Sequence, residues 1–241
     1  MPTLMVAPQV RYHDDMVGGE SNTRGQLRQT GQGVWLAVRQ AGLVSLALVA
    51  VIWVVQGINA ADGYRLDGEY GLMARNVGSL WHIFTMPFLH VSMEHIESNT
   101  LPLLILSFVA ALGGIRYFWL ATAFIVVVDG LGTWLISPSN VVTVGASGLI
   151  FGYLGFVIAR GLFTRKIWQV LIGALMAFYY FWTLPLLFPD AVTTSNNISW
   201  QGHLCGLIAG ILAAVLVGSL SREAERPAVQ GPLPPPGYPG F

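Results

Sequence analysis

The chain is poor in charged residues: only 10% of its 241 residues are Asp, Glu, Lys or Arg, whereas soluble domains carry about a quarter. Apolar residues make up 54% of the chain. So few charges leave apolar runs long enough to cross a bilayer, which takes about 20 residues of helix. The composition therefore argues against an ordinary soluble domain and predicts a multi-pass membrane protein.

The low net charge and the single cysteine argue against nucleic-acid binding and against a disulfide-bonded fold. The formal net charge is zero, so no overall attraction to nucleic acid is expected. The single cysteine, Cys205, cannot form an internal disulfide, and its setting among small residues favours a packing role over a reactive thiol. The chain also has no HExxH motif, and we predict that it binds no metal and no other cofactor.

Six apolar stretches are candidates for membrane helices. They cover residues 34–55, 95–112, 115–136, 147–163, 167–188 and 203–220. The fourth stretch is short, and the fifth contains Pro185 near its end. The sequence thus predicts an all-α fold, a six-transmembrane-helix bundle that occupies residues 34–221.

The two ends of the chain differ from this core. Residues 1–33 are polar and lack a sustained periodicity, which predicts a disordered arm. Residues 222–241 form a proline-rich tail. We expect this tail to be solvated, and a protein that binds polyproline segments is its possible partner.

The basic residues predict the orientation in the membrane. If the N-terminus is cytoplasmic, only Arg65 and Arg75 lie in outer segments, and the other ten of the twelve Lys and Arg lie inside. By the positive-inside rule, both termini are predicted in the cytoplasm of a cell-membrane protein.

In this orientation, the second, fourth and sixth stretches all run inward from the outer face. Polar residues mark their outer ends: His90, His95 and Asn99 at the second, Ser147 at the fourth and His203 at the sixth. Groups far apart in sequence are therefore expected at one depth, opening to the outer face. Polar chemistry within a membrane is costly and indicates function.

These residue types suit the hydrolysis of a peptide bond. A serine hydroxyl becomes a useful nucleophile when a neutral imidazole accepts its proton, and Ser147 with His203 can supply that pair. The Ser147 backbone N–H, at a helix start, could donate to an oxyanion. His95 and Asn99 lie four residues apart on one helix face and could donate as well.

Glycines in the fourth and sixth stretches would let the two helices approach closely. Gly148 and Gly152 have GxxxG spacing, as do Gly206 and Gly210, and Gly155 continues the fourth stretch. Such spacing permits tight crossing in lipid. The glycines could simply pack the bundle, or could also bring the serine and the histidine together.

Three blocks of residues match one known family. They are Trp81, Thr85, Phe88-Leu89-His90, His95-Ile96 and Asn99; then Gly145-Ala146-Ser147-Gly148; then His203, Gly206 and Gly210. With these blocks in order, the chain resembles the rhomboid intramembrane serine proteases over roughly residues 32–222.

The resemblance implies a role for each matched residue. Ser147 would be the nucleophile, and His203 would be the general base and later the general acid. His95, Asn99 and the Ser147 backbone would hold the oxyanion. His90 would be a structural histidine near the mouth of the site.

The resemblance also implies substrates: members with this six-helix core cleave other transmembrane proteins. The aromatic run at 178–182 would be a gate or an interface. Gly145, Gly148 and Phe151 would shape the site. Phe151 replaces the family's usual tyrosine, which keeps a ring to stack on the histidine but lacks its hydroxyl, and His82 replaces a common arginine.

Three acidic residues near these groups have no assigned role. Asp129 is expected to hydrogen-bond to a neighbouring helix, with orientation of a histidine as the alternative. Glu94 and Glu97 flank His95, and exposure to a water-filled cavity would explain why they are tolerated.

Two other functions remain open. An inactive rhomboid-like protein could bind membrane clients without cutting them, although the chain keeps both the serine and the histidine. A transporter or metal-binding channel could use His82, His90 and His95. The five-residue gap from His90 to His95 disfavours a helical metal site, whose ligands are usually three or four residues apart.

Overall fold

The computed structural model describes residues 14–164, 167–189 and 199–224. Its elements, in chain order, are α1 (Asp14–Ala61), α2 (Arg65–Tyr70), β1 (Leu72–Met73), the 3₁₀ helices η1 (Val77–Phe84) and η2 (Met86–Phe88), α3 (Met93–Leu112), α4 (Ile115–Ile136), β2 (Val142–Thr143), α5 (Ser147–Thr164), α6 (Ile167–Tyr179), the 3₁₀ helix η3 (Phe181–Leu187) and α8 (Trp200–Ala224). Apart from the short β1–β2 ladder, the described chain is helical, as predicted.

Not all of the six predicted stretches form helices that are long and apolar enough, by length and composition, to cross a membrane. Among the described residues, four helices are long and apolar enough to cross a membrane: Gly31–Ala61, Met93–Leu112, Ile115–Ile136 and Trp200–Arg222. The stretch at 147–163 is apolar but short. The stretch at 167–188 is broken between α6 and η3, which are bent by 67° and would make a fifth span if counted as one. Pro185 limits helical hydrogen bonding in this segment because it has no N–H.

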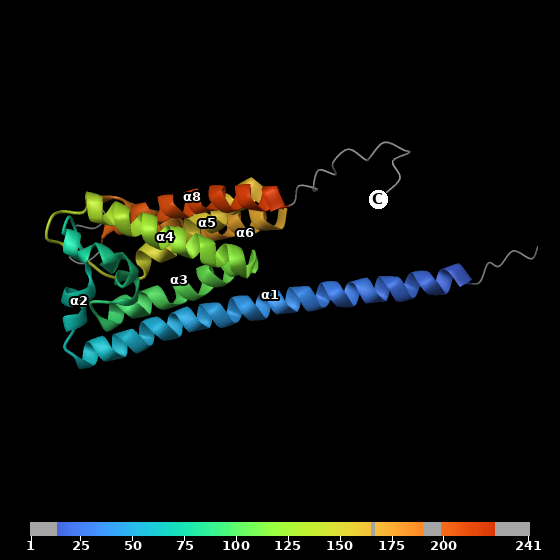
Figure 1. Cartoon of the computed structure of the whole chain (residues 1–241), viewed down its shortest axis with the longest axis horizontal. Coiled ribbons are helices and arrows are strands. Elements are labelled where there is room, and N and C mark those ends of the chain that lie inside the picture. Colours follow the sequence, from blue (N-terminus) through green and yellow to red (C-terminus); the bar gives the residue numbers. More distant parts are fainter. Residues whose placement is uncertain (1–13, 165–166, 190–198, 225–241) are drawn as a thin grey trace, which may run out of the picture.

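The first helix begins well before the predicted start. Residues 14–33, expected to be disordered, form the N-terminal part of α1, which extends past the rest of the bundle (Figure 1). A helix that is already nucleated extends at low cost, and no proline interrupts the sequence from Asp14 to Ala61. Residues 1–13 and the tail at 225–241, with its polyproline motif, lie outside the described residues.

Helix α5 is the centre of the bundle. Every residue from Gly148 to Val157 is buried, and α5 packs mainly on α8, α6 and α3. Large exposed apolar side chains lie instead on the outer helices, such as Leu43 on α1 and Phe178 on α6. This distribution is that of a membrane protein, in which apolar outer surfaces face lipid.

Backbone-to-backbone packing joins α5 to α8. A Cβ atom added at Gly206 would overlap the carbonyl of Gly148, and one added at Gly210 would overlap the carbonyl of Gly152. Gly155 contacts the backbone of α8 at Leu207 in the same way. The predicted close approach of these two helices therefore exists, and it fixes the start of α5 beside the start of α8.

The segment between α1 and α3 is tied to the segment that precedes α5. β1 pairs with β2 in antiparallel register, Leu72 opposite Thr143 and Met73 opposite Val142. The Gly145 N–H donates to the Met86 carbonyl at 2.9 Å. The long connection between α1 and α3 thus supports the entrance to α5.

Candidate functional site

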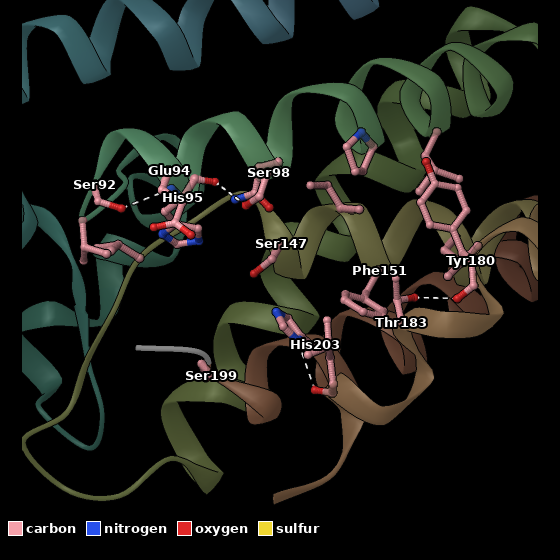
Figure 2. A pocket seen from close by; sticks show the side chains of 18 residues that line it. Ser92, Glu94, His95, Ser98, Ser147, Phe151, Tyr180, Thr183, Ser199 and His203 are labelled. Atoms are coloured by element: carbon pink, nitrogen blue, oxygen red, sulfur yellow. Dashed lines mark hydrogen bonds between the residues drawn. The ribbon is translucent and has the colours of Figure 1, made fainter. Parts of the chain in front are cut away.

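A cavity of about 520 Å³ opens at the end of the bundle where α3, α5 and α8 begin. Its lining residues are Val91, Ser92, Glu94, His95, Ser98, Asn99, Pro102, Leu106, Val144, Ser147, Ile150, Phe151, Leu154, Tyr180, Thr183, Leu186, Ser199 and His203. The two predicted dyad residues and both predicted side-chain oxyanion donors are therefore brought to one place. Figure 2 shows Ser147 and His203 facing the same part of this cavity from α5 and α8.

Ser147 is held at the first residue of α5 by the loop before it. Gly145 has φ of +125°, a conformation that side-chain-bearing residues rarely adopt. A Cβ at Gly145 would also lie 2.8 Å from His95 Cε1. The Ala146 N–H donates to His90 Nε2 at 3.4 Å. Because this loop is fixed on both sides, the serine has a defined position.

His203 lies in the first turn of α8 with one ring nitrogen engaged. Its Nδ1 is 3.1 Å from the Leu186 carbonyl oxygen. A carbonyl can only accept a hydrogen bond, so Nδ1 carries the proton and Nε2 is left as an acceptor. The Phe151 ring stacks on the imidazole, with centroids 4.5 Å apart and planes at 25°. The Leu186 carbonyl fixes the tautomer of His203, and this carbonyl and the Phe151 ring together fix the orientation of the imidazole.

His95 and Asn99 reach the cavity from α3. The helix begins at Met93, two residues earlier than predicted, because the Ser92 Oγ accepts from the His95 N–H at 3.1 Å and caps the helix. Asn99 is 7% exposed, and its Nδ2 has no hydrogen-bond partner within the described chain. A buried unpaired donor is costly and needs an explanation. Because Asn99 belongs to the cavity lining, its Nδ2 is a candidate donor to a ligand in the cavity.

His90 lies behind the cavity rather than in its lining. It is fully buried, and its ring meets that of His95 edge to face, with centroids 5.0 Å apart. Burial is the main cause that lowers the pKa of His90 to about 3, and the nearby His95 adds to it, against a backbone hydrogen bond at Phe88. The ring is therefore neutral, as acceptance of the Ala146 N–H requires.

The remaining predicted residues support the site from behind. Gly145 and Gly148 are buried and do not line the cavity. A side chain at Gly148 would overlap the Asp129 carboxylate, so Asp129 lies directly beneath the first turn of α5. The Asp129 Oδ1 accepts a hydrogen bond from the Thr133 hydroxyl at 3.2 Å. Its described partner is thus a residue of its own helix, not a neighbouring helix as expected.

Sequence reasoning missed several contributors. The Leu186 carbonyl, which orients His203, is invisible in a sequence because any residue supplies a carbonyl. Thr183 lines the cavity because η3 folds back over it after a bend that was not predicted. Tyr180 also lines the cavity, and it belongs to the aromatic run that was predicted to be a gate or an interface. Ser92 could have been found, since a serine just before an apolar helical run is a common N-cap.

The metal-site alternative gains no support. Within residues 14–164, 167–189 and 199–224, no group of three His, Cys, Asp or Glu side chains is arranged to hold a metal ion. His82 Nδ1 is instead engaged with the Gly71 carbonyl at 2.8 Å.

Comparison with known proteins identifies the family. A profile of the rhomboid domain matches residues 77–220, more than half of the chain. The chain belongs to the rhomboid family. The family resemblance deduced from the sequence blocks is thereby confirmed. The rhomboid match begins at η1 and ends in α8, so it contains every residue that lines the cavity.

The relatives of this chain include two uncharacterized mycobacterial proteins and one named rhomboid protease. An uncharacterized protein of Mycobacterium tuberculosis is 40% identical over 191 residues, which cover 76% of this chain and 78% of the relative. An uncharacterized protein of Mycobacterium leprae is 36% identical over 191 residues, covering 76% of this chain and 74% of the relative. The rhomboid protease GluP of Bacillus subtilis is 32% identical over 151 residues, covering 62% of this chain and 28% of GluP.

Proposed function

We propose that this rhomboid is an intramembrane serine endopeptidase that cleaves peptide bonds in or near the transmembrane segments of other membrane proteins. One observation carries the proposal: Ser147, His203, His95 and Asn99, from three separate helices, line one cavity, and the Leu186 carbonyl leaves His203 Nε2 available as a base. Membership in a family that includes proteases supports it.

In the first step, the Ser147 hydroxyl attacks the carbonyl carbon of the scissile peptide. The proton of the hydroxyl passes to His203 Nε2, which makes the imidazole positively charged. The Leu186 carbonyl, which accepts from Nδ1, and the Phe151 ring face both stabilise this charge.

The tetrahedral intermediate places a negative charge on the former carbonyl oxygen. The Asn99 Nδ2, the His95 side chain and the Ser147 N–H donate to it. Because the Asn99 donor is buried and unpaired before substrate arrives, it is already in place and needs no reorganisation.

In the second half of the reaction, His203 returns its proton to the leaving amine as the C–N bond breaks. A water molecule then enters the cavity, and His203 Nε2 accepts its proton while the water oxygen attacks the acyl-enzyme ester. As the ester C–O bond breaks, His203 passes this proton to the Ser147 oxygen, which restores the Ser147 hydroxyl and releases the carboxylate product.

We further propose six membrane spans, with both termini cytoplasmic and the cavity open to the extracytoplasmic face. The short helix α5 completes the count because protein, not lipid, surrounds it and relaxes the length requirement. α6 with η3 forms the fifth span. The distribution of Lys and Arg supports the orientation.

Proteolysis in liposomes tests the proposal. The purified protein is reconstituted with a panel of fusion proteins, each carrying one transmembrane segment, and fragments are identified by mass spectrometry. Cleavage should occur with the wild type, be absent with Ser147→Ala, and persist with EDTA. Cleavage by Ser147→Ala, or loss of cleavage with EDTA, would overturn the serine mechanism. A panel that binds but is never cut would instead indicate a client-binding rhomboid.

A further inference from the structure

The cavity is polar at one end and apolar at the other. Ser92, Glu94 and Ser98 line the end near the start of α3, whereas Leu106 and Leu154 line the far end. Glu94 and Leu106 are twelve residues apart on α3, which corresponds to about 18 Å along the helix. In Figure 2, Glu94 lies with Ser92 and His95 at one side, and Phe151 lies with Tyr180 and Thr183 at the other. A bound chain therefore meets carboxylate and hydroxyls first and aliphatic side chains further in.

Glu94 is the charged residue of this rim. It is exposed and belongs to the cavity lining, in which no Lys or Arg takes part. The ion pairs among the described residues join Arg65 to Asp62 and to Glu69, so Glu94 has no basic partner within 4.0 Å in that part of the chain. The Glu94 carboxylate is thus available to a cation brought by a ligand.

A second observation indicates that a ligand can bind near this carboxylate. Asn99 lines the same cavity, is 7% exposed and has an unpartnered Nδ2. That donor suits the carbonyl oxygen of a bound peptide. Asn99 is five residues beyond Glu94, about 7.5 Å along the helix. An extended peptide advances about 3.3 Å per residue, so a side chain two or three residues from that carbonyl reaches Glu94.

We propose that Glu94 determines substrate specificity and selects membrane proteins with a Lys or Arg two or three residues from the scissile bond, toward the polar end of the cavity. The inference rests on the proposed protease function and deepens it by naming the class of substrate. The apolar part of such a substrate continues toward Leu106 and Leu154, as the end of a transmembrane helix would.

Such a preference would bias the choice of substrates. Lys and Arg are concentrated at the cytoplasmic ends of membrane helices, so a basic residue at the outer end is uncommon. An acidic rim that favours such a residue gives the few helices that carry one an advantage over the many that do not.

The test measures kcat/KM for four sets of three substrates, and the three members of a set differ at one position. A substrate that the wild type cleaves is given Lys, Gln or Glu at each of the second and third positions on both sides of its mapped cleavage site. At one of these positions, the wild type should prefer Lys over Gln by about fivefold, as expected for a partly exposed charge pair. The Glu substrate should be the poorest.

Two substitutions of Glu94 test whether this residue causes the Lys preference. Glu94→Gln should abolish the Lys preference, and Glu94→Lys should reverse it in favour of the Glu substrate. Glu97→Gln is the matched control, because Glu97 is exposed on the same helix and does not line the cavity. It should keep the Lys-to-Gln ratio within twofold of the wild type. Ratios within one variant cancel any loss of folded protein.

The outcomes separate this inference from the function on which it rests. Equal cleavage of the Lys, Gln and Glu substrates at all positions would overturn the role of Glu94 while leaving the protease intact. Equal loss of preference in Glu94→Gln and Glu97→Gln would also overturn it, in favour of a diffuse acidic field. Absence of any Ser147-dependent cleavage would instead overturn the proposed function.

Discussion

The two ends of the bundle differ in what their buried polar side chains contact. At the end that holds the cavity, Asn99 keeps an unpartnered donor. At the other end, Arg160 of α5 is 6% exposed and donates through Nη2 to the Gly113 carbonyl at 2.6 Å. Its guanidinium also lies over the rings of Tyr117 and Phe156, at 5.7 and 5.3 Å from their centroids. There, the polar group joins α5 to the turn between α3 and α4.

On the proposed function, this difference would separate catalysis from stability within one bundle. A buried donor satisfied by the protein stabilises the fold, whereas one left for a substrate lowers the stability of the free protein and binds in the transition state. Substitutions at the cavity end should therefore change rates, and those at the Arg160 end should change the free energy of unfolding. The following experiments test this contrast between the two ends.

The largest effect on rate short of the dyad is expected at Asn99. Asn99→Ala removes an oxyanion donor and should lower kcat for substrate cleavage by about 10²–10³-fold. Thr100→Val is the control, because the Thr100 hydroxyl accepts from Trp53 Nε1 at 2.9 Å and faces α1. It should lower the melting temperature and leave kcat within about threefold. Similar kcat values for Asn99→Ala and the wild type would remove Asn99 from the mechanism.

Gly206 should show how strongly the site depends on close helix packing. Gly206→Ala forces a methyl group against the Gly148 carbonyl and should destabilise the protein by about 2–3 kcal/mol. In α1, Gly57 has no atom within 4 Å of its would-be Cβ, so Gly57→Ala should be neutral or stabilising. Denaturant titrations of both variants in detergent measure the contrast. Equal stability of the two would mean that α5 and α8 do not need the glycine contact.

Acid should destabilise the protein through His90. Its pKa is about 3 in the folded protein and about 6.5 in an unfolded chain, so the unfolded state binds more protons between these values. The contribution of His90 to the free energy of unfolding is fully present above about pH 6.5 and is lost as the pH falls toward 3. The loss between pH 7 and pH 5 is about 2 kcal/mol.

The matched variant for this pH effect is His90→Gln, whose side chain can still accept the Ala146 N–H but does not titrate. The free energy of unfolding is measured at pH 7 and at pH 5 for both proteins. The decrease from pH 7 to pH 5 should be about 2 kcal/mol smaller in His90→Gln than in the wild type. Identical losses would show that His90 is protonated in the folded protein or unimportant for the loop that holds Ser147.

The smallest effect is expected at the opposite end. Arg160→Met keeps much of the aliphatic volume, loses the hydrogen bond to Gly113, and should lower the unfolding free energy by about 1.5 kcal/mol. The kcat/KM of the folded fraction should stay within twofold, because Arg160 is remote from the cavity. A tenfold loss of kcat/KM at unchanged stability would break the separation between the two ends.

Much of this arrangement could be predicted from the sequence, because its signals are local. Charge scarcity and long apolar runs indicated membrane helices, and GxxxG spacing indicated the contact between Gly148 and Gly206. The gathering of Ser147, His203, His95 and Asn99 followed from topology, since alternate helices of a bundle begin at the same face. Each of these inferences needs only residue type and spacing.

The features that were missed depend on tertiary contacts or on backbone atoms. The Leu186 carbonyl became the partner of His203 only because η3 folds over the cavity after a 67° bend. Asp129 was expected to reach a neighbouring helix, but a one-turn hydrogen bond to Thr133 was available on its own helix. Helix α1 extended to Asp14 because an existing helix propagates through residues that would not nucleate one.

Covalent labelling tests the central claim, that His203 activates Ser147, most directly. The wild type, Ser147→Ala and His203→Ala are incubated in detergent with a fluorophosphonate probe, and the labelled residue and labelling rate are determined by mass spectrometry. We expect a single adduct at Ser147, none in Ser147→Ala, and a rate at least about 100-fold lower in His203→Ala. Labelling of His203→Ala at the wild-type rate, or an adduct that persists in Ser147→Ala, would contradict the account.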